Sequence, residues 1–126
     1  MLHEAELVAF IATSDLERAR AFYCGVLGLA AVEESPFALV LDANGVSVRV
    51  TPVEAPVVAP YTVLGWRVAD TTATARALVT AGVVCERFDG MDQDGDAIWT
   101  APGGARIAWF RDPDGNVLSV SQAPGS

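Results

Sequence analysis

The sequence predicts an α+β fold in which two βαβββ modules form one domain over residues 1–126. Each half of the chain places an apolar strand, a capped helix and a hairpin in the same order. The helix ends repeat at nearly the same spacing, with Asp15 and Gly28 in the first half and Asp70 and Gly82 in the second. Because one module leaves a face of its sheet uncovered, we expect the two mixed sheets to curl into a trough with the helices packed outside.

Module one, about residues 4–55, opens with an apolar strand over residues 7–12. Ser14 and Glu17 have the spacing of a capping box, in which the Ser oxygen accepts a bond from a free helix N–H. Gly28 suits the left-handed position that ends a helix, and a strand follows near residues 30–33. Helical spacing predicts that the helix buries one face made of Leu16, Ala19, Phe22, Tyr23, Val26 and Leu27.

Module two, about residues 61–122, repeats this order. A strand is predicted over residues 61–68, and Asp70 is the predicted N-cap of the helix that follows. Gly82 ends that helix, and an additional strand is expected near residues 83–88. The predicted buried face of this helix consists of Ala73, Ala77, Leu78 and Ala81.

Each module closes with a hairpin, because a turn signal separates two β-rich runs. In module one, Asn44-Gly45 lies between residues 37–41 and 46–50. In module two, Pro113 and Gly115 lie between residues 105–110 and 117–121. Three prolines over residues 52–60 mark the linker between the modules.

Composition limits the expected partners and compartment. The net charge is −8 and the basic residues are scattered, so neither nucleic acid nor an anionic membrane is expected to bind. No apolar run approaches the roughly 20 residues of a membrane span, and the N-terminus lacks a signal-peptide pattern. Cys24 and Cys85 do not form a secreted disulfide framework, so free thiols and a cytoplasmic location are expected.

Two motifs resemble a known family. Residues 14–23, Ser-Asp-Leu-Glu-Arg-Ala-Arg-Ala-Phe-Tyr, followed by Val-Leu-Gly-Leu at 26–29, are similar to the first module of the vicinal oxygen chelate superfamily, the group of glyoxalases, bleomycin-resistance proteins and extradiol dioxygenases. Residues 110–118 resemble its closing hairpin, and residues 90–102 and 108–110 are loosely similar to an uncharacterised subgroup. The resemblance implies a ligand site in the trough and a homodimer.

Enzymes of this superfamily usually bind a divalent metal with His, Gln or Glu from the first and last strands of both modules. The corresponding positions here are Val8, Arg49, Val63 and Ser119. Val has no donor atom, Arg stays protonated and a Ser hydroxyl is a weak ligand. Neighbouring residues are no better, so we expect no metal cofactor, and whether the chain is an enzyme stays open.

Two other places could hold a metal. His3 is the single histidine and lies near the N-terminus. The acidic residues 89–96 superficially resemble a calcium loop but lack its glycine position and its closing Glu. We therefore interpret residues 89–96 as a solvated loop or a lid over the trough.

Strand alternation divides the side chains between two faces. Counting from the four ligand positions, the trough side should also carry Phe10, Ser47, Thr51, Gly65, Arg67, Val117 and Ser121. The helix side should carry Leu7, Ala9, Ile11, Leu64, Trp66, Val68, Leu118 and Val120. Buried Arg49 needs water, an acid such as Glu54, or an anionic or carbonyl-bearing ligand. Trp99 and Trp109 either pack in the core or form an aromatic wall.

Three functions follow from these residues. The leading hypothesis is metal-independent binding of a small, partly apolar or aromatic molecule, comparable to drug sequestration by bleomycin-resistance proteins. The second is a lyase-like or dioxygenase-like enzyme with a non-standard site, using a carboxylate from residues 89–96 with Arg49. The third is a non-catalytic dimerising module. The predicted ligand-binding residues are Phe10, Arg49, Arg67, Trp99, Trp109 and Ser119.

Overall fold

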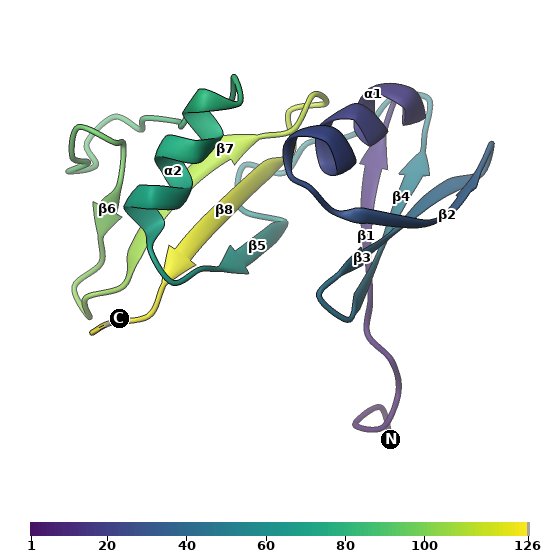
Figure 1. Cartoon of the computed structure of the whole chain (residues 1–126), viewed down its shortest axis with the longest axis horizontal. Coiled ribbons are helices and arrows are strands. Elements are labelled where there is room, and N and C mark those ends of the chain that lie inside the picture. Colours follow the sequence, from purple (N-terminus) through teal and green to yellow (C-terminus); the bar gives the residue numbers. More distant parts are fainter. Residues whose placement is uncertain (126) are drawn as a thin grey trace. The chain divides into compact units, whose positions relative to one another are not determined.

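The computed structural model describes residues 1–125 as two compact units, Met1–Val57 and a second that begins at Val58. These are called unit 1 and unit 2. Each contains one four-stranded mixed sheet and one helical segment, so the α+β class and the repeated module are confirmed (Figure 1).

Unit 1 has the strand order β1-β4-β3-β2. β1 (Val8–Thr13) runs parallel to β4 (Val46–Pro52), whereas β3 (Ala38–Ala43) is antiparallel to both β4 and β2 (Ala30–Ser35). The helix α1 (Leu16–Arg20) continues without a break as a π-helix over Ala21–Val26. Its buried residues Ala19, Phe22 and Tyr23 face a sheet surface made of Ile11, Leu39, Leu41, Val48 and Val50.

The start of α1 corrects the predicted capping box. The N-cap is Asp15, whose Oδ1 accepts from the backbone N–H of Arg18 at 3.1 Å. Ser14 lies one residue too early and its Oγ instead accepts from the Arg18 guanidinium at 2.9 Å. A carboxylate is at least as good an N-cap as a hydroxyl, which explains the shift by one residue. The wider π turn also leaves Val26 exposed, contrary to the predicted buried face.

Unit 2 has the matching strand order β5-β8-β7-β6. β5 (Leu64–Arg67) runs parallel to β8 (Val117–Gln122), and β7 (Arg106–Arg111) is antiparallel to β8 and to the two-residue β6 (Trp99–Thr100). The helix α2 (Thr71–Thr80) crosses β7 and β8 on one face of this sheet (Figure 1). That face is built from Ala108, Phe110, Leu118, Val120 and Gln122, all of them buried.

The predicted N-cap Asp70 is confirmed, because its Oδ1 accepts from the backbone N–H of Ala73 at 3.0 Å. The predicted buried face of α2 is wrong apart from Leu78. Thr71 is fully buried instead, since its N–H donates to Gln122 Oε1 and its hydroxyl donates to the Arg106 carbonyl. These bonds rotate α2 so that Thr71, Ala75 and Leu78 face the sheet while Ala73, Ala77 and Ala81 are exposed.

The largest departure from the predicted elements lies between α2 and β6. Residues 83–88 do not form the expected strand, although the Glu86 N–H donates to the Trp109 carbonyl at 2.7 Å. The predicted strand over residues 61–68 shortens to β5. Other turn predictions are confirmed, since Asn44 and Gly45 have φ of 51° and 93°, as a tight hairpin turn requires.

Among residues 1–125, no helix is long and apolar enough to cross a membrane.

Candidate functional site

The open face of the unit 2 sheet, opposite α2, gathers four of the six predicted ligand-binding residues. Ser119 pairs with both Gly65 and Trp109, and therefore shares their side of the sheet. In the next row, Ser121 pairs with Arg67 and Ile107, and Ile107 pairs with Trp99. Paired residues project to the same face, so Arg67, Trp99, Trp109 and Ser119 lie on one surface. The predicted division of the unit 2 strands between two faces is consistent with this register.

Gly65 makes room for the Ser119 hydroxyl on this surface. A Cβ placed on Gly65 would lie 3.0 Å from Ser119 Oγ, which is closer than real Cβ atoms normally approach an oxygen. Trp66 projects to the other face, where its ring stacks on buried Phe110 with centroids 6.5 Å apart. The helix-side position predicted for Trp66 is consistent with this contact, although the side chain is half-buried and not part of the fully buried core.

Trp109 is the centre of an aromatic cluster on the open face. Its ring lies 6.2 Å from the ring of Trp99 in a tilted arrangement and 5.5 Å from Phe88 edge to face. These separations are typical of favourable aromatic pairs. All three aromatic residues are half-buried, so the cluster leaves ring surface that a bound molecule can contact.

A pocket of about 240 Å³ adjoins this cluster. It is lined by side chains from the start of unit 2, from the segment before β6 and from β7 and β8, among them Tyr61, Phe88, Met91, Trp109, Arg111 and Val117. The Arg111 guanidinium donates to Glu86 Oε1 at 2.8 Å and to the Gly115 carbonyl at 3.0 Å. Its charge is thus largely offset, which leaves an apolar pocket with a fixed polar edge.

Sequence analysis did not identify Tyr61, Phe88, Met91 and Arg111 as site residues. Strand alternation could have identified Arg111, because it lies two positions from Trp109 on the same strand and so faces the same side. Phe88 and Met91 come from irregular chain, where no periodicity indicates direction.

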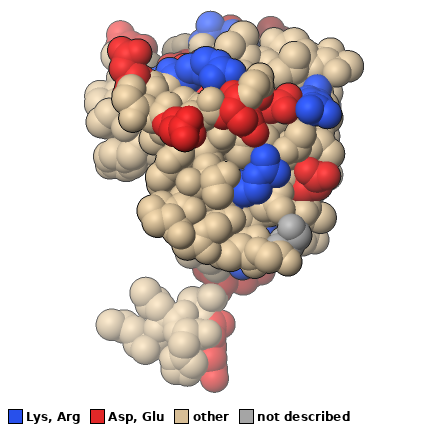
Figure 2. Space-filling view, turned by 90° about the vertical axis from the view of Figure 1, so that its left-hand side faces the viewer, with Lys and Arg blue, Asp and Glu red and all other residues tan. Residues whose placement is uncertain are grey.

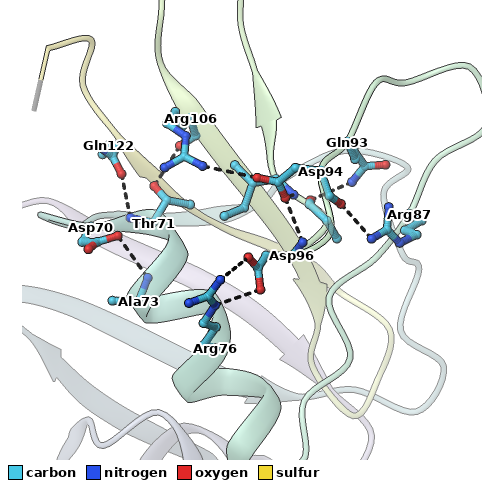
Figure 3. A network of polar contacts seen from close by, with 12 residues as sticks. Asp70, Thr71, Ala73, Arg76, Arg87, Gln93, Asp94, Asp96, Arg106 and Gln122 are labelled. Carbon is cyan, nitrogen blue, oxygen red and sulfur yellow. Dashed lines mark hydrogen bonds and ion pairs between the residues drawn. The ribbon is translucent and has the colours of Figure 1, made fainter.

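The acidic residues 89–96 form an ordered loop held by its own polar groups (Figure 3). Gln93 Nε2 donates to the carbonyls of Glu86 and Ala97, and Gln93 Oε1 accepts from the Phe88 N–H. Asp94 Oδ1 accepts from the N–H groups of Asp96 and Ile98. The loop that carries Phe88 and Met91 to the pocket is therefore fixed by side-chain bonds rather than by a sheet ladder.

Two arginines pair with Asp94 and Asp96, two of the four carboxylates of this loop. Arg106 Nη2 lies 3.3 Å from Asp94 Oδ2, and Arg76 makes a two-pronged contact with Asp96 at 3.1 and 3.0 Å. The bonds from Arg76 lower the pKa of Asp96 below its usual value of 3.8. Carboxylates engaged in this way are poorly placed to act as a general base or as calcium ligands.

The remaining predicted residues lie in unit 1, where Phe10 pairs with Arg49 and both share one face of the sheet. Phe10 is 67% exposed and Val8 is 42% exposed. Arg49 is half-buried, and within residues 1–125 no carboxylate lies within 4.0 Å of it. The pair with Glu54 that the sequence suggested does not form.

The four positions that the family resemblance aligns with metal ligands do not fit a divalent ion, because Val8, Arg49, Val63 and Ser119 offer no carboxylate or imidazole. Over the part of the chain that the structure describes, no three His, Cys, Asp or Glu side chains are grouped closely enough to hold a metal. No metal-dependent step can be derived from these residues.

The model of the glyoxalase/bleomycin resistance protein/dioxygenase superfamily matches residues 5–120. The chain belongs to this superfamily. Membership of this superfamily supports, in general terms, a role in small-molecule binding or in chemistry of the superfamily's kind. No curated protein matched the chain in a sequence comparison.

Solved structures share the fold. A lactoylglutathione lyase from Agrobacterium tumefaciens is 20% identical with a TM-score of 0.69, over 95% of this chain and 94% of the other. A glyoxalase-related enzyme from Fulvimarina pelagi is 22% identical with a TM-score of 0.71, over 95% and 88%. A superfamily member from Alicyclobacillus acidocaldarius is 17% identical with a TM-score of 0.70, over 94% and 91%. At these identities the similarity shows the fold alone.

Proposed function

We propose that the chain binds a small, flat, partly apolar molecule on the open face of the unit 2 sheet without a metal ion. One observation carries the proposal: the Trp99–Trp109–Phe88 cluster borders a pocket in which Arg111, the one cation among the described lining residues, is paired with Glu86. Aromatic walls with a few fixed polar groups are typical of small-molecule sites. Sequestration of a planar antibiotic or metabolite, as in bleomycin-resistance proteins, is the biological role that this binding would serve.

Arg67 adds a preference for a polar group on the ligand. It is exposed on the same face as Trp99, and no carboxylate in residues 1–125 lies within 4.0 Å of its guanidinium. An arginine in this state donates readily to a carbonyl or an anionic oxygen. The favoured ligand therefore combines a ring system with an oxygen acceptor at its edge.

The binding proposal is tested by calorimetry with 2-naphthol and 2-acetylnaphthalene. Trp109→Leu should weaken both probes about fivefold, because stacking on an aromatic face contributes roughly 1 kcal/mol. Arg67→Gln should weaken only the probe that carries the carbonyl. Trp66→Phe is the matched control, since Trp66 lies on the helix side, and should bind both probes as the native chain does. Equal affinity in Trp109→Leu, or a flat response to both probes and to a broad metabolite and antibiotic panel, would contradict the proposal.

Metal independence needs a separate measurement. Elemental analysis of the purified chain should find less than one divalent ion per chain, and EDTA should leave probe affinity unchanged. A stoichiometric ion whose removal abolishes binding would instead favour the oxygen chemistry of metal-dependent relatives.

A homodimer, a cytoplasmic location and the absence of nucleic-acid and membrane partners remain proposals. Sedimentation at several protein concentrations tests the dimer. The enzyme alternative would have to draw its carboxylate from Asp89 or Asp92, because Asp94 and Asp96 are engaged in structural contacts.

A further inference from the structure

A second, larger cavity lies in unit 2 between α2 and residues 83–97, away from the aromatic cluster. Its volume of about 530 Å³ is more than twice that of the open-face pocket. Pockets of roughly 300–1,000 Å³ are the usual size for small organic ligands. The two cavities share no lining residue.

Somewhat more than half of the cavity wall is apolar. Ala75 is buried at its base, and Val79, Val83 and Val84 form its sides. Val79 is 59% exposed and Val84 is 72% exposed, so two branched apolar side chains meet water at the rim. An apolar ligand body would remove this surface from water, which is favourable at about 25 cal/mol per Å².

The thiol of Cys85 also lines the cavity, within 4.0 Å of the Ala75 carbonyl. Burial raises the pKa of Cys85, and the nearby charges of Asp96 and Glu86 act in the same direction. The thiol therefore stays protonated near neutral pH and is a poor nucleophile. The single histidine of the chain, His3, lies in unit 1, so the cavity contains no imidazole base. These groups suit binding and not covalent chemistry.

The charges around the cavity do not cancel. Arg76 and Asp96 neutralise each other through their two-pronged contact (Figure 3). Arg87 donates only to the backbone carbonyl of Asp94, at 2.8 Å, and within residues 1–125 no carboxylate side chain lies within 4.0 Å of it. Figure 2 shows acidic and basic side chains intermingled on this side of unit 2. Arg87 thus leaves one uncompensated guanidinium at an apolar cavity, in a chain of net charge −8.

We propose that this cavity binds a small monocarboxylic acid with a branched aliphatic body, the carboxylate on Arg87 and the body against Val79, Val83 and Val84. A guanidinium matches the two oxygens of a carboxylate in a planar arrangement. A dianion would exceed the single free charge, and a neutral molecule would leave Arg87 without an anionic partner. This site is additional to the proposed open-face site and does not depend on it.

The test is a titration of the isotope-labelled full chain, followed by backbone amide NMR shifts. The probes are 4-methylpentanoate, its neutral analogue 4-methylpentanamide, and acetate, each up to about 20 mM, where fragment-sized ligands bind. With 4-methylpentanoate we expect saturable shifts confined to residues 75–80, 83–87 and 95–97. The amide and acetate should each bind at least about tenfold more weakly, because one lacks the charge and the other the apolar body.

Variants and a chemical footprint make the test specific. Arg87→Gln should reduce affinity for 4-methylpentanoate at least about tenfold. Arg18→Gln, which removes an exposed arginine from unit 1, should leave it unchanged. In Cys24→Ser, where Cys85 is the remaining thiol, 4-methylpentanoate should slow alkylation of Cys85 by iodoacetamide and 4-methylpentanamide should not. Equal shifts with acid and amide, full affinity in Arg87→Gln, or unprotected Cys85 would overturn the proposal.

Discussion

The two units have the same order of elements but differ in the segment between the helix and the closing hairpin, which we call the arm. In unit 1 this arm is β2, six residues paired with β3. In unit 2 the corresponding chain, residues 83–98, is irregular and only the two-residue β6 follows. Both arms are tied to their helix by an ion pair, Arg20 with Glu34 in unit 1 and Arg76 with Asp96 in unit 2.

The difference shows how a repeated scaffold acquires a site. A paired strand points alternate side chains to two fixed faces and leaves little freedom. The irregular arm of unit 2 instead carries Phe88 and Met91 to the open-face pocket and Arg87 to the cavity beside α2. Its order comes from side chains, chiefly Gln93, and not from a ladder of backbone bonds.

The largest expected effect comes from removing that internal support. Gln93→Leu leaves the Phe88 N–H and the carbonyls of Glu86 and Ala97 without their partner, and should lower the free energy of unfolding by about 2 kcal/mol. Urea denaturation measures this loss, and hydrogen exchange at the Phe88 amide should accelerate.

The matched change in unit 1 is Ser35→Ala. Ser35 Oγ accepts from the N–H groups of Phe37 and Ala38, but the β2–β3 ladder remains when it is removed. We expect a loss below about 1 kcal/mol. If Ser35→Ala cost as much as Gln93→Leu, the contrast between a ladder and a side-chain clamp would be wrong.

A smaller effect is expected from the N-caps, a feature that the two units share. Asp15→Ala and Asp70→Ala should each lower the free energy of unfolding by about 1 kcal/mol, because each side chain caps a helix N–H three residues on. Asp→Asn at either position should recover most of the loss. If Asp15→Ala left the free energy of unfolding unchanged and Ser14→Ala lowered it, the N-cap of α1 would be Ser14, as the capping box predicts.

The smallest expected effect is on how stability depends on pH. Because Arg76 lowers the pKa of Asp96 in the folded chain, the pair stabilises the fold fully above the ordinary value of 3.8. This contribution disappears as the pH falls through the lowered value. Denaturation between neutral pH and about pH 3 should therefore be less acid-sensitive in Asp96→Asn than in the native chain. Asp92→Asn removes the same charge from the same loop, and an equal change there would show that general charge, not the pair, is responsible.

Turn chemistry made much of the fold predictable from sequence. Asn44-Gly45 and the closing turn around Pro113 fixed both hairpins, and Asp70 was identified as a cap. Alternation predicted that Arg67 and Ser119 share one face, and their strand register agrees with this. Trp99 and Trp109 were left open between core and ligand wall, and the register places them on the same face.

The errors arose where tertiary contacts override local pattern. The face of α2 is set by the bonds of Thr71 to Gln122 and to the Arg106 carbonyl, which lie 51 and 35 residues away in sequence. Residues 83–88 resemble a strand in sequence, yet Gln93 holds them in another arrangement. No periodicity within the run could reveal a partner beyond its end.

Residues 85–88 in the arm of unit 2 lie between the cavity beside α2 and the open-face pocket. Cys85 and Arg87 face the cavity beside α2, while Phe88 lines the open-face pocket and Glu86 holds Arg111 there. An occupant that displaces residues 85–88 from one side would reshape the other. Thermodynamic linkage then requires the two occupants to change each other's affinity by the same factor. Four consecutive residues would thereby let an organic acid govern how tightly the chain retains an aromatic compound.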